Sequence, residues 1–80
     1  MSATKRNHAM FAQQLSKIIK QRRQILRIGP DDLAEIAGVG RRTLFYMEEG
    51  NANPSLETMT KVLDVLGMEL KIVLKNEPES

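Results

Sequence analysis

The stretch from Pro30 to Gly50 constrains the fold of this 80-residue chain more than any other part. Its apolar residues recur at helical spacing on both sides of two glycines, which predicts two short amphipathic helices joined by a tight turn. Pro30 and the two aspartates after it are typical of a helix start. Gly38 suits the left-handed position that ends a helix, and Gly40 is the expected N-cap of the second helix, Arg41 to Glu48.

The second helix of this pair combines an apolar inner side with a polar outer side. Leu44 and Met47 are spaced by three and are expected to face the core. The residues expected to face outward are Arg41, Arg42, Thr43, Phe45, Tyr46 and Glu49. Positive charge at a helix N-terminus is unfavourable because that end of the helix dipole is itself positive. Two arginines there therefore favour a polyanionic partner over the alternative, a solvated helix end.

Two longer amphipathic segments flank this pair. Residues 9–26 and 55–66 carry apolar side chains at helical spacing, with Ser55 as the expected N-cap and Gly67 as the expected C-terminal stop of the latter. Val39, in the turn, is expected to anchor in the core. The apolar stripes consist of Phe11, Leu15, Ile18, Ile19, Ile25 and Leu26, then Leu33, Ala34, Ile36 and Ala37, and finally Leu56, Met59, Thr60, Leu63 and Leu66.

The period of the pattern changes from 3.6 to two after Gly67. Leu70, Ile72 and Leu74 share one face of a strand predicted over residues 68–75. The chain offers no second strand to pair with it, and its backbone N–H and C=O groups need partners. An antiparallel copy from a second subunit, related by a two-fold axis, provides them. The alternative is a frayed helical or extended tail.

The length of the chain allows one domain of mainly α class, with four to five helices and this one strand. We expect a flexible basic arm over residues 1–8, the helical domain over 9–67 and a disordered tail over 76–80. Residues 1–42 contain nine Lys and Arg and three acids, whereas residues 43–80 contain three Lys and seven acids. The two halves thus differ in sign, which favours a basic side that faces phosphates over an ordinary solvated charge run.

Several function classes lack support in the sequence. The chain has no cysteine and a single histidine, His8, so neither a disulfide nor a metal site is expected. There is no phosphate-binding glycine loop and no convincing pair of carboxylates, so we expect neither an enzyme nor a cofactor. No apolar run approaches the roughly 20 residues that a membrane span needs. We expect a soluble, cytoplasmic protein.

Three blocks in order resemble the lambda-repressor/Cro-like, or XRE-type, helix-turn-helix family. They are KIIKQRR (17–23), DDLAEIAGVGRRTLFYMEEG (31–50) and NPSLETMTKVLDVLG (53–67). With GMELKIVL (67–74) added, the chain is most similar to the HipB-type antitoxins. This resemblance implies a small dimeric repressor that binds the operator of its own operon and also holds a HipA-like toxin kinase.

The resemblance also implies which residues contact DNA. The first, second, third and sixth residues of the recognition helix would read bases, and these are Arg41, Arg42, Thr43 and Tyr46. Arginine can donate two hydrogen bonds to one guanine. The residues expected to contact phosphates are Lys20, Arg22, Arg23, Asn51 and Asn53. The sequence departs from the family pattern at Arg27, where a glycine is common, and at Gly29, Pro30 and Gly40, where the family usually has a capping hydroxyl or a glutamine.

The sequence therefore predicts a dimeric, sequence-specific DNA-binding repressor. As a dimer it would bind an inverted-repeat operator in the bacterial nucleoid, and the resemblance implies that it is the antitoxin of a HipA/HipB-like operon. The alternative is a protein-binding module that inhibits a partner enzyme and binds little DNA. The exposed Phe45 and the acidic second half of the chain would serve that role.

Overall fold

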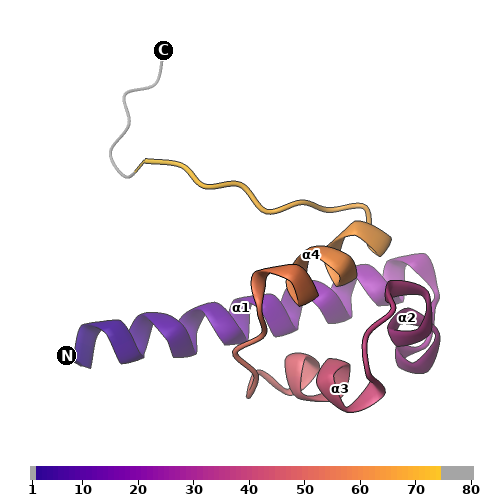
Figure 1. Cartoon of the computed structure of the whole chain (residues 1–80), viewed down its shortest axis with the longest axis horizontal. Helices are drawn as coiled ribbons and strands as arrows, with labels where there is room; N and C mark the ends of the chain where they lie inside the picture. Colours follow the sequence, from indigo (N-terminus) through magenta and orange to yellow (C-terminus); the bar gives the residue numbers. More distant parts are fainter. Residues whose placement is uncertain (1, 75–80) are drawn as a thin grey trace.

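The computed structural model describes residues 2–74, with side chains from Met10 onward, and this part of the chain forms four helices. They are α1 (Ser2–Leu26), α2 (Pro30–Ala37), α3 (Arg41–Glu49) and α4 (Leu56–Val65). The other three helices lie around the C-terminal half of α1, and the N-terminal part of α1 projects beyond them (Figure 1). The segment after α4 runs back along the molecule toward the N-terminal end of α1.

All four helices contribute to one small core. Its buried apolar residues are Leu15, Ile19, Leu33, Ala34, Leu44, Met47, Val62, Leu63 and Leu66. The helix α3 packs against both α1 and α2, and α2 also packs against α4. Val39 packs against the core from the turn, which confirms its predicted anchoring role. This packing fixes the α2–turn–α3 unit on the rest of the domain.

The four helices end in the same way, with one residue of positive φ. Gly38, Gly50 and Gly67 take φ values of 74°, 77° and 74°, a conformation that glycine adopts without strain from a Cβ atom. At each end, the N–H groups of this residue and of the next one donate to carbonyls of the last helical turn. The predicted stops at Gly38 and Gly67 are confirmed. Arg27 occupies the equivalent position after α1, with φ of 59°.

The helix starts divide into two kinds. Gly29 and Gly40 are the N-caps of α2 and α3 and provide no side-chain hydrogen bond. Ser55 caps α4, where its hydroxyl accepts a hydrogen bond from the backbone N–H of Thr58 at 3.1 Å. These positions confirm the predicted N-caps at Gly40 and Ser55 and the helix start at Pro30.

Part of the predicted burial is wrong. Five apolar residues of the predicted stripes are exposed, namely Phe11, Ile25, Leu26, Ile36 and Leu56. Thr60 is also exposed, whereas Val62, outside the predicted stripe, is completely buried. The predicted stripes contain more apolar positions than so small a core can cover, and α4 is turned so that Val62, Leu63 and Leu66 face inward.

The helix α1 begins at Ser2, so residues 2–8 of the predicted basic arm are helical. Residues 2–9 contain neither glycine nor proline, so nothing in this segment ends the helix. Once nucleated, a helix gains one backbone hydrogen bond for each further residue that it fixes. Met1 lies outside the described residues.

The predicted strand over residues 68–75 is not present as a strand in the single chain. Residues 68–74 have no regular secondary structure, and the described part of the chain contains no strand at all. A strand requires a hydrogen-bonded neighbour, and one copy of this chain supplies none. Lys75 and the predicted disordered tail over 76–80 lie outside the described residues. Pairing across a dimer remains a prediction.

Candidate nucleic-acid interface

The orientation of α3 agrees with the predicted orientation. Leu44 and Met47 are each 1% exposed and hold its inner side in the core. Arg41, Arg42, Thr43, Phe45, Tyr46 and Glu49 are all exposed. The three residues of the first turn thus present two guanidinium groups and a hydroxyl to solvent. Because Leu44 and Met47 fix α3 in the core, these donors project from a rigid element.

One of the two arginines already has a partner. The Nη1 atom of Arg41 donates to Oδ2 of Asp31 at 3.1 Å, which links the start of α3 to the start of α2. The two side chains are 74% and 72% exposed. An exposed pair of this kind contributes little to stability. It does, however, restrict the directions in which the Arg41 guanidinium can point.

The outer face of α3 also carries an aromatic pair. The ring centroids of Phe45 and Tyr46 lie 5.4 Å apart, with the rings inclined at 69° in an edge-to-face arrangement. These side chains remain 56% and 45% exposed. Two large rings on the surface of so small a domain suggest contact with another molecule, since their burial there would be favourable.

A largely buried ion pair on the inner side of α3 links this helix to α1. Arg23 Nε donates to Glu48 Oε2 at 2.9 Å and Nη2 donates to Oε1 at 3.1 Å, while Nη1 donates to the Ile28 carbonyl at 3.2 Å. Ser16 donates from its hydroxyl to the backbone carbonyl of Glu48. The sequence pattern did not indicate this role for Glu48, although the residue lies in the family-like E-x-G ending of the helix. This contact ties the C-terminal end of α3 to α1.

Arg22 and Arg23, which were predicted to contact phosphates, have partners within the domain. The Nε and Nη2 atoms of Arg22 donate to the Leu66 carbonyl at the end of α4, at 3.2 and 3.0 Å. Arg23 is occupied by Glu48 and Ile28. A carbonyl at a helix end and a largely buried carboxylate both require donors, and these arginines provide them. Phosphate contact by Arg22 or Arg23 remains a prediction, and it would require these side chains to leave or share their present partners.

Comparison with known proteins finds a family that covers α2, α3 and the segments on both sides of them. Residues 19–73 match the family described as Helix-turn-helix. The chain belongs to the helix-turn-helix family. This confirms the family-level resemblance, whereas the HipB-type subdivision is not tested and remains a prediction. Within this family, α2 and α3 are the two helices of the motif, and α3 is the recognition helix.

Two relatives of this helix-turn-helix protein are 35% and 41% identical to it over the aligned residues. One from Methanococcus maripaludis, provisionally named an HTH-type transcriptional regulatory protein, is 35% identical over 54 residues, 68% of this chain and 17% of the relative. An uncharacterized HTH-type transcriptional regulator from Haemophilus influenzae is 41% identical over 51 residues, 64% of this chain and 52% of the relative. The chain thus spans about a sixth of the first relative and about half of the second.

The remaining residues expected to contact phosphates lie on the surface. Lys20 is exposed on α1, and Asn51 and Asn53 are exposed in the loop that directly follows the recognition helix. The backbone N–H of Asn51 donates to the Tyr46 carbonyl at 3.1 Å, so this loop begins from a defined position on α3. An ammonium and two amides of this kind are suitable donors to phosphate oxygens.

A second exposed region of the helix-turn-helix domain is apolar. An open groove of about 600 Å³ runs between α1, α4 and the C-terminal segment, and its apolar lining residues are Phe11, Leu56, Met68, Leu70 and Ile72. Ile72 is 99% exposed, and Val73 and Leu74 are 79% and 74% exposed. We call these lining residues, together with Leu74, the apolar region. Exposed side chains of this kind are typical of a surface that another protein chain covers.

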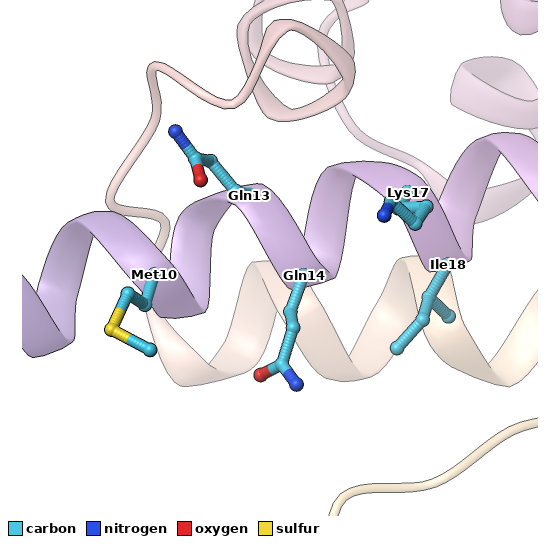
Figure 2. A pocket seen from close by; sticks show the side chains of 5 residues that line it. All are labelled: Met10, Gln13, Gln14, Lys17 and Ile18. Atoms are coloured by element: carbon cyan, nitrogen blue, oxygen red, sulfur yellow. The ribbon is translucent and has the colours of Figure 1, made fainter.

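A shallow hollow of about 710 Å³ lies along α1 and is lined by Met10, Gln13, Gln14, Lys17 and Ile18. Met10, Gln14 and Ile18 point to one side of the helix (Figure 2). All of these residues come from one helix, and among the residues that the structure describes no second element lines the hollow. Within the described part of the chain, no three His, Cys, Asp or Glu residues gather as metal ligands, and no helix is long and apolar enough to cross a bilayer.

Proposed function

We propose that this protein is a sequence-specific DNA-binding repressor that reads bases with the start of α3. The observation that supports this most is the exposure of Arg41, Arg42 and Thr43 on a helix held by buried Leu44 and Met47. Each arginine can donate two parallel hydrogen bonds to O6 and N7 of a guanine. Thr43 can exchange a hydrogen bond with a base or place its methyl group against a thymine.

Tyr46 and the surface donors complete the proposed contact. Tyr46 lies four residues after Arg42 and therefore on the same side of the helix. Its hydroxyl donates to a phosphate, or its ring lies against a base edge. Lys20, Asn51 and Asn53 contact phosphates, which sets the orientation of the domain without reading sequence. DNA also compensates the unfavourable positive charge at the N-terminus of α3.

The proposal includes a homodimer that forms through the apolar region. Leu70, Ile72 and Leu74 alternate along an extended segment whose backbone has no strand partner in the single chain. A second copy supplies both an antiparallel strand and an apolar surface for the groove. The dimer then places two recognition helices about 34 Å apart, or a multiple of this distance, so the operator is an inverted repeat.

A narrower proposal concerns the biological role. The similarity of the segment GMELKIVL to HipB-type antitoxins supports a repressor that controls its own operon at the bacterial nucleoid and binds a HipA-like toxin kinase. Co-expression with the product of the adjacent gene tests this role. A stable complex with a kinase-like protein supports it, and the absence of any such neighbour or complex contradicts it.

One observation favours a second candidate function. Phe45 is 56% exposed beside Tyr46, and such an aromatic surface also suits a protein partner. In this alternative, the domain inhibits a partner enzyme and binds DNA weakly. The first function requires tight operator binding that depends on the arginines of α3, whereas the second does not.

A gel-shift experiment separates the two functions. The probe is the duplex upstream of the gene for this protein, with excess random-sequence duplex as competitor. We expect a shifted band at about 10 nM protein or below, in the range of specific regulators. The Arg41→Ala/Arg42→Ala variant should lose this band. A wild-type protein that leaves the probe unshifted even at low ionic strength would contradict the proposed function.

A further inference from the structure

The contact between Asp31 and Arg41 joins the first turns of the two helices of the motif. Asp31 belongs to the first turn of α2, and Arg41 is the first residue of α3. Leu33 and Leu44 are buried in one core, so the helix starts are fixed relative to each other. The 3.1 Å hydrogen bond therefore connects two rigid elements through one long side chain.

We infer that Asp31 is a positioning residue that aims the Arg41 guanidinium at its base, an inference that rests on the proposed DNA-reading function. Asp31 occupies the Nη1 atom of Arg41. The Nε and Nη2 atoms then form the remaining edge of the planar group, and this edge carries two parallel N–H donors. Two parallel donors match O6 and N7 of guanine.

The ion pair between Asp31 and Arg41 has a larger expected effect on DNA binding than on folding. With side chains 74% and 72% exposed, the pair contributes little to folding stability. A free arginine, however, loses much rotamer freedom when it is fixed on a base. A partner that restricts the side chain before DNA arrives reduces this loss. The benefit applies only to the base that matches the fixed orientation.

The carboxylate of Asp31 has a second effect on DNA binding. It places a negative charge beside a residue that approaches the phosphate backbone, which opposes binding to every sequence. The operator compensates for this repulsion through the guanine contact, whereas random DNA does not. Asp31 thus increases the ratio of specific to non-specific affinity by both effects.

The neighbouring residue offers a matched control. Asp32 lies in the same turn of α2, is also exposed, and forms no ion pair with a described residue. Asp31→Ala and Asp32→Ala remove the same charge from the same helix end. They differ in whether Arg41 loses its partner. Asp31→Glu restores a carboxylate and serves as the rescue variant.

The experiment selects binding sites from a randomised duplex library with the full chain. The base position read by Arg41 is the one whose preference disappears in Arg41→Ala. We expect Asp31→Ala to reduce the preference at this position about threefold to tenfold, as a misaligned guanine contact would. Asp32→Ala should keep the preference, and both variants should bind random duplex about twofold to fivefold more tightly in about 0.1 M salt. Asp31→Glu should recover most of the preference.

The double variant decides whether the effect passes through Arg41. In an Arg41→Ala background, Asp31→Ala should change no base preference further. Equal preference profiles for Asp31→Ala and Asp32→Ala would overturn the positioning role while leaving the proposed function intact. Failure of the wild-type protein to enrich any sequence would overturn both. Asp31→Ala and Asp32→Ala should lower the unfolding temperature slightly and alike, because each removes one acid from the first turn of α2, whereas the exposed ion pair adds little.

Discussion

The two exposed regions of this small domain differ in chemistry and in how firmly they are held. The start of α3 exposes hydrogen-bond donors on a helix that is fixed by Leu44, Met47 and the contact of Glu48 with Arg23. The apolar region exposes aliphatic side chains, and residues 68–74 within it have no regular secondary structure. The first region is formed before any partner arrives, whereas the second requires a partner to form its backbone hydrogen bonds.

This difference shows how one short chain can present two kinds of surface. A rigid polar surface suits a ligand of fixed geometry such as duplex DNA, because little conformational freedom is lost on contact. An apolar segment without internal partners suits a second protein chain, because association buries its side chains and pairs its backbone. The proposed repressor needs both surfaces at once.

The largest effect on operator affinity is expected when charged residues replace apolar ones in the apolar region. The double variant Leu70→Asp/Ile72→Asp should convert the dimer to a monomer, since it places charge on the face of the segment that a second copy would cover. Operator affinity should fall on the order of 100-fold or more, because two linked half-sites are then bound independently. Analytical ultracentrifugation measures the dissociation of the dimer, and gel shift measures the fall in affinity.

The matched control for this variant is Val73→Asp. Val73 is 79% exposed but lies on the other face of the alternating pattern. It should leave the dimer intact. A double variant that remains dimeric, or a Val73→Asp protein that dissociates equally, would contradict the proposed use of the apolar region.

The next effect concerns the rigidity of the polar region. Glu48→Ala should lower the free energy of unfolding by about 2–4 kcal/mol, since it leaves the largely buried Arg23 without its carboxylate partner. Urea denaturation measures this change. Glu49→Ala removes an exposed acid one residue later and should change stability by less than about 0.5 kcal/mol. Equal effects of both variants would show that Glu48 does not support α3.

A third experiment separates base reading from phosphate binding within the polar region. Arg41→Ala should weaken operator binding by about 1–3 kcal/mol and relax preference at one base in each half-site. Lys20→Ala should weaken binding to all sequences alike and reduce the slope of log affinity against log salt by about 0.9 for each phosphate that the lysine no longer neutralises. If Arg41→Ala weakens all sequences equally, Arg41 does not read a base.

The smallest effect is a gain in stability outside both regions. Arg27→Gly should raise the free energy of unfolding by about 1 kcal/mol, because Arg27 has a φ of 59°, where a Cβ atom is unfavourable and glycine is not. Thermal or urea unfolding measures the change. Since neither exposed region is altered, dimerisation and operator preference should stay as in the wild type. A decrease in stability would show that the Arg27 side chain makes a stabilising contact of its own.

Local signals in the sequence predicted much of the helical scaffold. Gly38, Gly67 and Ser55 mark helix ends through backbone or side-chain chemistry that needs no distant partner. The outward face of α3 followed from the spacing of Leu44 and Met47. These features depend on residues within one or two helical turns.

Long-range contacts could not be predicted in the same way. The partners of Arg22 and Arg23 lie 44 and 25 positions away, and an arginine on an amphipathic helix resembles any solvated charge. The rotation of α4, which buries Val62 and exposes Leu56, depends on the neighbouring helices. The start of α1 carries no breaker that would mark a boundary. The ion pair between the first turns of α2 and α3 likewise depends on how these helices pack.

The central claim is that two recognition helices enter successive major grooves, and site-directed cleavage tests it most directly. The chain has no cysteine, so Glu49→Cys provides a single attachment point at the exposed end of α3 for an iron chelate that cuts nearby DNA. We expect two clusters of cuts about 10 base pairs apart, or a multiple of this spacing, on a selected operator. The same chelate on Lys61→Cys in α4 should cut weakly. Strong cutting from Lys61→Cys and none from Glu49→Cys, with the DNA bound, would contradict the claim.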